Sequence, residues 1–518
     1  MCCLLLKKYK PQRLLEKKLQ SGDNITGMRI LQLVFFVMTL AITWLTGCAD
    51  GNAPPRTIKL TDCRIPKLPV AAQCGTLVVP ENREKPEGRK ITISIALLRA
   101  NTLNPLPDPL FILAGGPGQA ASYLGPFAAK LTDVRKNRDI VLVDQRGTGR
   151  SSPLTCAAFN ADATPTTTLE LNPTPKASAC ANELFAQGID AAQYTTETWI
   201  QDLDAVRSGL GYTKINLWGG SYGTRVAIEY MRRYSSHVRS AVLDGVVPPS
   251  MMVSLDVWQT RDAALSRIRD ECANISTCQA AYPHLHQALA TISANLGPNG
   301  KEVMLSDPRT GQSQKQHLSF DHIIGALQPL TYSPEFSALL PNIISRAAAG
   351  DYGPLYASTM QATTDLAKQM NNALYYSVTC AEDVPRLTLE NTASALENVR
   401  SKTLAQRTLA ICKIWPKGKV PDDAAQPIRS ALPTLILSGG LDPATPPANG
   451  AEVAETLLSS RHIVARGYGH IVSPHACGPR LIAAFIDRPD FSSLPIACVD
   501  HFEKSTGPAL WIDNLGRQ

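Results

Sequence analysis

Short apolar runs alternate with longer segments of helical periodicity along most of the chain. Short runs bounded by glycine, proline or polar residues are typical of buried strands, and apolar positions spaced three and four residues apart are typical of helices. Alternation of the two predicts a mostly parallel sheet with helices on both faces. The predicted strands lie near residues 76–79, 91–98, 110–113, 140–143, 214–218, 240–243, 434–438 and 462–465.

A long helical segment interrupts this alternation between the sixth and seventh predicted strands. Residues 249–427 are too many for a loop and predict a helical cap domain inserted into the core. The core would then comprise residues 74–248 and 428–518, preceded by a linker at 48–73. The Thr/Pro-rich stretch 161–176 is typical of an exposed excursion.

The N-terminal segment predicts where the protein is located. Residues 28–47 are basic and then apolar, are too short for a comfortable membrane span, and are followed by Cys48. This pattern resembles a bacterial lipoprotein signal, with Cys48 as the lipidated first residue of the mature chain; a plain secretory signal is the alternative. Ala49 lacks the acidic side chain associated with inner-membrane retention, so we expect a periplasmic or outer-membrane-anchored protein. Residues 1–27 then form an upstream extension, and translation would start at Met28.

The cysteines agree with export. Of the 13 cysteines, three (Cys2, Cys3 and Cys48) lie in the N-terminal segment, and the other ten fall in close pairs along the chain. An oxidising compartment would permit up to five disulfides, although spacing alone does not fix their connectivity and free thiols are the alternative. Pairing of sequence neighbours would join Cys63 to Cys74, Cys156 to Cys180, Cys272 to Cys278, Cys380 to Cys412, and Cys477 to Cys498.

Composition limits the class of protein and partner. The 518 residues, 44% of them hydrophobic, can bury a large core. The formal net charge is +7, but residues 1–27 hold six Lys/Arg and two Asp/Glu, which leaves +3 for the rest. So small a net charge is not typical of a protein that binds nucleic acid. We therefore expect no nucleic-acid partner, and contact with a membrane only through the lipid anchor.

The motif Gly219-x-Ser221-x-Gly223 lies between a predicted strand and an amphipathic helix. A serine presented on so tight a turn is a nucleophile elbow, in which flanking glycines relieve the crowding. The five-residue pattern alone also fits an ordinary surface loop. Its position between strand and helix favours Ser221 as a nucleophile, which requires a base, an orienting acid and oxyanion donors.

Candidates for the acid and the base follow the last two predicted strands. Asp442 lies in the loop after residues 434–438, and His470 lies in the loop after residues 462–465. The order Ser, Asp, His is the one that an α/β-hydrolase fold uses. His475 is the nearby rival for the base, and Asp442 by itself could be a turn residue before proline.

Backbone donors for an oxyanion are also present. The residue after the nucleophile, Tyr222, supplies one N–H in this fold, and the loop after the third strand supplies the other. That loop reads Ala-Gly-Gly-Pro-Gly at residues 114–118. Because proline has no N–H, Gly116 is the expected donor; a simple glycine turn is the alternative.

Taken together, these motifs resemble a known family. Gly-Gly-Pro-Gly at 115–118, Asp-Gln-Arg-Gly-Thr-Gly-Arg-Ser-Ser at 144–152, Gly-Gly-Ser-Tyr-Gly at 219–223, Cys-Lys-Ile-Trp-Pro at 412–416 and Gly-Leu-Asp-Pro-Ala-Thr-Pro at 440–446 are similar to the proline iminopeptidase and tripeptidyl aminopeptidase family of α/β-hydrolases. The resemblance extends from about residue 74 onward. Ala114, where proline iminopeptidases usually have histidine, places it nearer the tripeptidyl aminopeptidase branch.

The resemblance implies an α/β-hydrolase fold and acyl transfer through an acyl-enzyme, with no metal or organic cofactor. Asp144 and Arg146 are expected to brace their loop. The family places an acid for the substrate ammonium on its cap, and Thr-Cys-Ala-Glu-Asp at 379–383 makes Glu382 the first candidate and Asp383 the second; solvated loop acids are the alternative. The expected function is an exported aminopeptidase acting on short peptides. A carboxylesterase or lipase, and a catalytically silent binding lipoprotein, are the rivals.

Overall fold

The computed structural model describes residues 55–160, 174–397 and 402–503. The predicted signal segment 28–47, Cys48 and residues 161–173 of the predicted excursion lie outside these ranges. Among the helices described, none is both long enough and apolar enough to cross a bilayer.

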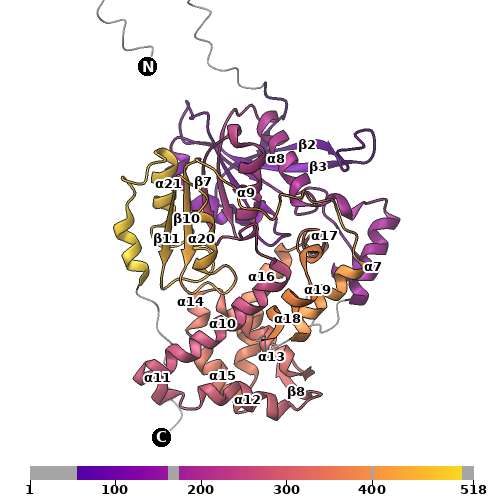
Figure 1. Ribbon diagram of the computed structural model, residues 1–518, viewed down its shortest axis with the longest axis vertical. Helices are drawn as coiled ribbons and strands as arrows, with labels where there is room; N and C mark the ends of the chain where they lie inside the picture. Colours follow the sequence, from indigo (N-terminus) through magenta and orange to yellow (C-terminus); the bar gives the residue numbers. More distant parts are fainter. Residues whose placement is uncertain (1–54, 161–173, 398–401, 504–518) are drawn as a thin grey trace, which may run out of the picture. The chain divides into compact units, whose positions relative to one another are not determined.

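Within the described residues, nine strands form one sheet, in the order β1-β2-β3-β5-β4-β6-β7-β10-β11 (Figure 1). The strands β1, β2, β3 and β5 pair antiparallel, and every neighbour from β5 to β11 pairs parallel. The mostly parallel sheet and all eight predicted strands are confirmed. The strands are β1 Thr61–Cys63, β2 Ala72–Pro80, β3 Lys90–Leu98, β4 Leu110–Leu113, β5 Ile140–Val143, β6 Ile215–Gly220, β7 Val238–Asp244, β10 Thr434–Gly439 and β11 Ser460–Ala465.

Strand β1 lies inside the segment that the sequence assigns to a linker. Its three residues have no apolar alternation that could mark a strand. They pair antiparallel with β2, and the disulfide between Cys63 and Cys74 joins the two strands. Tertiary pairing, not local sequence, makes this edge strand.

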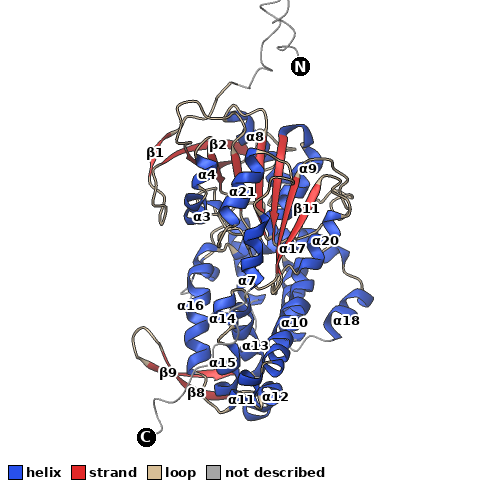
Figure 2. Cartoon of the chain, turned by 90° about the vertical axis from the view of Figure 1, so that its left-hand side faces the viewer, coloured by secondary structure: helices blue, strands red, loops and turns tan. Residues whose placement is uncertain are grey.

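Helices cover both faces of the sheet because successive strand residues point to opposite sides (Figure 2). Phe111 and Leu113 of β4 belong to the apolar cluster under α8 and α9, whereas Leu110 and Ile112 belong to the cluster under α3 and α21. The helices of this part are η1 Ala121–Leu124, α3 Gly125–Lys130, α4 Thr132–Arg135, α5 Ala157–Asn160, α7 Thr174–Ala186, η2 Ala191–Gln193, α8 Thr196–Gly209, α9 Tyr222–Arg233, η3 Ser235–His237, α20 Pro447–Ala454, α21 Gly478–Asp487 and η6 Ile496–Glu503.

The segment between β7 and β10 packs in two ways. Its first helices bury an apolar cluster of their own, which includes Leu265 and Ile344. Leu374 and Ile411, from α17 and α19, instead share the cluster of β6 and α9. The elements are α10 Val253–Asn274, α11 Ser276–Ala281, α12 Leu285–Leu296, β8 Lys301–Ser306, β9 Ser313–Leu318, α13 Phe320–Leu327, η4 Gln328–Thr331, α14 Pro334–Ser337, α15 Leu340–Ala348, α16 Gly353–Gln369, α17 Asn372–Glu382, η5 Val384–Arg386, α18 Leu389–Glu397 and α19 Lys402–Ile414.

The predicted cap, residues 249–427, therefore contains elements with two different packing partners, and its limits stay a prediction. Helices α17 and α19 are joined by a disulfide between Cys380 and Cys412. Ion pairs from Arg225 to Glu382 and Asp383 hold the end of α17 against α9, the helix that follows Ser221.

All five disulfides between sequence neighbours are formed, so the predicted pairing is confirmed. The bonds join Cys63 to Cys74, Cys156 to Cys180, Cys272 to Cys278, Cys380 to Cys412, and Cys477 to Cys498.

Candidate active site

Ser221 occupies the tight turn between β6 and α9. Its backbone has φ 56° and ψ −127°, a region that residues with a side chain seldom adopt. A β carbon on Gly219 would lie 2.3 Å from the carbonyl oxygen of Gly223, and one on Gly223 would lie 2.2 Å from that of Leu113. Both glycines of the motif are therefore required for the turn, which has the geometry of a nucleophile elbow.

Asp442 and His470 meet in the loops that follow β10 and β11. The Nδ1 atom of His470 lies 2.8 Å from Oδ2 of Asp442. The other carboxylate oxygen of Asp442 accepts the N–H groups of Ala444 and Thr445, both at 2.8 Å. The Asp442 side chain is fully buried and that of His470 is 10% exposed. Since a proton on Nδ1 faces the carboxylate, Nε2 is left as the basic nitrogen.

The rival histidine has other surroundings. The ring of His475 packs against that of Tyr468, with centroids 4.7 Å apart. Burial lowers the pKa of His475. Asp442 thus pairs with the histidine that the sequence favours.

Asp244, at the end of β7, joins the elbow to the histidine loop. Its carbonyl accepts the N–H of Ser221 at 2.9 Å. Its buried carboxylate accepts the N–H groups of Val472 and Ser473 at 3.0 and 2.7 Å. A β carbon on the next residue, Gly245, would lie 3.3 Å from Cε1 of His470. The imidazole therefore lies beside the turn that carries Ser221.

Sequence reasoning missed Asp244, although it stands at the end of a predicted strand, where an α/β fold places its functional loops. It also missed Tyr332, whose ring meets that of His470 edge to face at 5.2 Å. The Tyr332 carbonyl accepts the N–H of His470 at 2.9 Å. No local pattern marks Tyr332, because only the return of the inserted segment to the core brings it there.

The predicted oxyanion loop follows β4, which pairs with β6. A β carbon on Gly115 would lie 3.0 Å from Cβ of Ser221, so the loop closes directly over the nucleophile. Gly116 has φ 114°, a conformation that favours glycine. Tyr222 is the first residue of α9, where backbone N–H groups have no acceptor within the helix.

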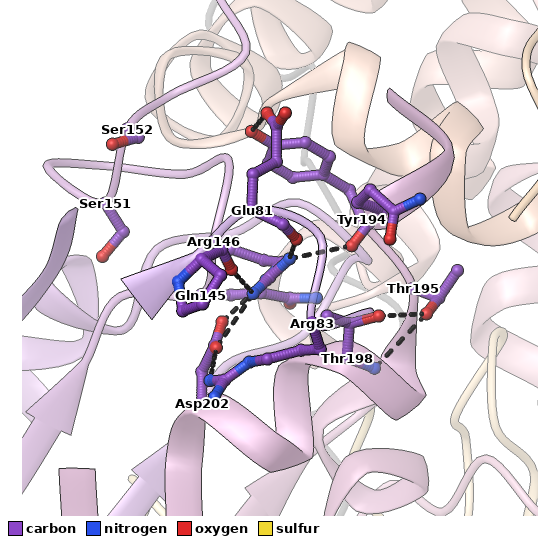
Figure 3. A network of polar contacts seen from close by, with 12 residues as sticks. Glu81, Arg83, Gln145, Arg146, Ser151, Ser152, Tyr194, Thr195, Thr198 and Asp202 are labelled. Carbon is purple, nitrogen blue, oxygen red and sulfur yellow. Dashed lines mark hydrogen bonds and ion pairs between the residues drawn. The ribbon is translucent and has the colours of Figure 1, made fainter. Parts of the chain in front are cut away.

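Arg146 and Asp144 join their loop to neighbouring parts of the core. The Arg146 guanidinium is fully buried and donates to both carboxylate oxygens of Asp202, at 2.6 and 2.9 Å (Figure 3). It also donates to the carbonyl of Glu81 at 2.7 Å. The Asp144 carboxylate accepts the N–H of Ser122 at 2.8 Å and that of Arg150 at 3.1 Å. Both side chains brace loops of the core.

Glu382 and Asp383, the predicted ammonium-binding acids, are both buried. The alternative of solvated loop acids is therefore wrong, because the Glu382 side chain is folded against α8 and that of Asp383 against α9 and α10. Asp383 accepts from Nη1 of Arg225 at 3.1 Å and from the N–H of Ser254 at 2.9 Å. Glu382 accepts the N–H and the hydroxyl of Thr196, at 2.7 and 2.9 Å. Their predicted role toward the substrate stays a prediction.

A cavity of about 650 Å³ runs along one face of α10. It is lined by Asp262, Asp270 and Glu271 together with Arg267. Nη2 of Arg267 donates to the carbonyl of Leu441 at 2.8 Å, beside Asp442. An acidic face of the inserted segment thus adjoins the loop that carries the candidate orienting acid.

The sequence matches the family described as the alpha/beta hydrolase fold over residues 108–474. The chain belongs to the α/β-hydrolase family. The serine protease Hip1 of Mycobacterium tuberculosis is 24% identical over 485 residues, which cover 86% of this chain and 92% of that protein. The tripeptidyl aminopeptidase of Streptomyces lividans is 26% identical over 461 residues, or 81% of this chain and 82% of that one.

Among solved structures, this α/β-hydrolase is similar to the proline iminopeptidase of Mycobacterium smegmatis at 15% identity and a TM-score of 0.35, over 83% of this chain and 98% of that one. The family match and the relatives, which include a serine protease and an aminopeptidase, together show that the chain is a serine hydrolase. The resemblance read from the sequence motifs is confirmed at the level of this family.

Proposed function

We propose that this enzyme is an exported serine exopeptidase that removes short N-terminal pieces, such as tripeptides, from peptides. The observation that carries the proposal is the bond between Asp442 and His470 beside the strained turn of Ser221. Similarity to a tripeptidyl aminopeptidase over 81% of this chain supports the choice of peptide substrates.

In this mechanism, Nε2 of His470 takes the hydroxyl proton of Ser221 while Oγ attacks the substrate carbonyl. The N–H groups of Tyr222 and Gly116 stabilise the tetrahedral oxyanion. His470 then returns the proton to the leaving amine, and the peptide bond breaks to give an acyl-enzyme. Water, deprotonated by His470, attacks the acyl-enzyme; the ester bond to Ser221 then breaks, His470 returns the proton to Oγ of Ser221, and the N-terminal piece is freed. Asp442 holds the imidazole and stabilises its charged form.

An aminopeptidase must also bind a substrate ammonium, which requires a carboxylate in a partly desolvated place. Glu382 and Asp383 are the acids that the family resemblance suggests. The α10 cavity offers a second set, Asp262 and Glu271. Replacing each acid by its amide and comparing free with N-acetylated peptides distinguishes them, because an ammonium-binding acid raises KM for the free amine alone.

Export and anchoring belong to the same proposal. Five disulfides support export, because disulfides form and persist in oxidising compartments. Cys48 would carry the lipid that holds the mature protein at the periplasmic side of a membrane. Labelling cells with a fatty acid should mark the wild-type chain and not Cys48→Ser; labelling that survives the substitution contradicts the anchor.

The test of the reaction uses the full chain and Ser221→Ala side by side. Fluorogenic peptides of one to three residues, with free or acetylated N-termini, are compared with short acyl esters. Cleavage of the free peptides that disappears in Ser221→Ala is the expected result. Turnover of esters alone, also lost in Ser221→Ala, would make the enzyme a carboxylesterase or lipase with the same catalytic residues. Hydrolysis that persists in Ser221→Ala would overturn the mechanism.

A further inference from the structure

A chain of hydrogen bonds runs from the residue after the nucleophile to a buried carboxylate on α17. The phenol oxygen of Tyr222 lies 2.7 Å from Oγ1 of Thr196. The Thr196 hydroxyl lies 2.9 Å from Oε2 of Glu382, and the Thr196 N–H donates to Oε1 at 2.7 Å. Nε2 of Gln145 donates to the Tyr222 phenol at 3.4 Å. Four elements that are distant in sequence meet at this chain.

The number of hydroxyl protons available determines which group donates in each of these hydrogen bonds. An ionised Glu382 can only accept, so the single hydroxyl proton of Thr196 is directed to it. Thr196 must then accept from the phenol of Tyr222. The phenol oxygen remains free to accept from Gln145. With Glu382 ionised, every donor in the chain therefore has an acceptor, and the side chain of Tyr222 is held from both sides.

Glu382 is 9% exposed and borders a cavity. Burial raises the pKa of its carboxyl to about 7, although Arg225 and the bonds from Thr196 oppose the shift. Nη1 of Arg225 lies 3.9 Å from Oε2, and Asp383 follows directly as the C-cap residue of α17. The cavity, of about 260 Å³, gives protons a route to Glu382. The charged side chains lining it are Glu197, Arg225, Glu229, Glu382, Arg386 and Asp422.

This cavity is not lined by Ser221 or His470. Arg225 and Glu229 bring to it the face of α9 that also carries Tyr222. Glu382 therefore lies beside the helix that begins at Tyr222.

We propose that Glu382 is a positioning residue, which fixes Tyr222 through Thr196 and so aims the Tyr222 N–H at the developing oxyanion. The inference rests on the oxyanion role proposed for Tyr222. Protonated Glu382 would donate to Thr196, and the hydrogen bond between Thr196 and Tyr222 would reverse its direction. The Tyr222 hydroxyl proton would then lose its acceptor, and the oxyanion donor would lose its fixed orientation. Turnover should therefore depend on the ionisation of Glu382 even for substrates that have no amine.

The decisive experiment measures kcat and KM of the full chain for a short acyl ester between pH 5.5 and 8.5, in wild type and Glu382→Gln. The amide can donate to Thr196 but cannot ionise, so it imitates the protonated acid at every pH. We expect kcat of Glu382→Gln to be lower by roughly 10-fold at pH 8, less than the effect of deleting an oxyanion donor outright. Near pH 5.5 the wild type and Glu382→Gln should have nearly the same kcat, because wild-type Glu382 is protonated there as well. KM should not change.

Two further variants separate positioning from general loss of structure. Tyr222→Phe breaks the series of hydrogen bonds at its other end without removing a charge. The double variant with Glu382→Gln should have a kcat less than about 2-fold below that of Tyr222→Phe alone. Glu81→Gln is a matched control. It removes another buried carboxylate that accepts a phenol, that of Tyr194 at 2.8 Å, and its kcat relative to wild type should not vary with pH. If Glu382→Gln does not fold, Tyr222→Phe alone should show the lower kcat and the altered pH profile.

The outcomes also separate this inference from the proposed function. If the ratio of wild-type kcat to Glu382→Gln kcat is independent of pH, the positioning role is overturned while the hydrolase mechanism stays intact. A loss confined to free-amine peptides would return Glu382 to ammonium binding. Ester hydrolysis that survives Ser221→Ala would instead remove the mechanism on which the inference stands.

Discussion

At the scale of single residues, the site depends on the strained backbone of Ser221 and on the buried pair of Asp442 with His470. Ser221 holds positive φ because its N–H is bound to Asp244 and the helix begins at the next residue. Asp442 has both oxygens occupied by loop N–H groups, Thr445 and His470, so the imidazole has a defined tautomer. These contacts keep the nucleophile and the base in place before substrate arrives.

The strain at Ser221 predicts a separation of stability from activity. Ser221→Gly removes the β carbon that makes φ 56° unfavourable, whereas Ser221→Ala keeps it. Both variants should be inactive, and the glycine variant should be more stable than the alanine variant by about 1 kcal/mol. Urea unfolding of the two proteins measures the difference. Equal stabilities would mean that the turn relaxes around either residue.

The raised pKa of Glu382 predicts how stability depends on pH. The folded pKa, about 7, lies above the unfolded value of 4.5, so the folded protein binds the extra proton between these values. The stability from this carboxyl is therefore complete below about pH 4.5 and is lost as the pH rises through about 7. The unfolding free energy of Glu382→Gln relative to wild type should increase between pH 4.5 and 8, by on the order of 3 kcal/mol. A difference that stays constant with pH would contradict the shift.

At the scale of elements, close contact between β4 and the start of α9 sets the elbow. A β carbon on Gly223 would lie 2.2 Å from the carbonyl oxygen of Leu113, a backbone atom that cannot rotate away. Gly223→Ala should therefore abolish activity and destabilise the core by several kcal/mol, at the upper end of single substitutions. Gly125→Ala is the control, because its β carbon would approach Leu68 no closer than 3.4 Å on a short helix. Activity and melting temperature of the two variants test this contact.

At the scale of the whole molecule, the inserted segment is tied to the core through α17 and α19. The disulfide between Cys380 and Cys412 closes a separation of 32 residues, while that between Cys272 and Cys278 closes only 6, and all four cysteines are buried. In the chain-entropy account, removing the longer link should cost about 1.5 kcal/mol more than removing the shorter one. Paired Cys→Ala variants, compared by urea unfolding, measure this difference. Loss of activity should accompany only the longer link, since α17 carries Glu382.

The sequence by itself determined the parts of the protein that depend on local pattern. Apolar runs and glycine turns are local, so the eight strands, the elbow at Ser221 and the loops of Asp442 and His470 could be predicted. The close cysteine pairs were also predictable, because chain neighbours meet easily when both end in a compact core. Strand β1 could not be predicted, since a polar three-residue edge strand forms only against β2.

Only the tertiary structure decided which distant groups share a hydrogen bond. Asp244 joins Ser221 to the loop of His470, and Tyr332 returns from the inserted segment to the same loop. Glu382 follows a motif that suggests substrate binding, yet its carboxylate faces Thr196 on α8. These contacts join residues tens to hundreds of positions apart, and the packing of whole helices, which no local pattern records, brings them together.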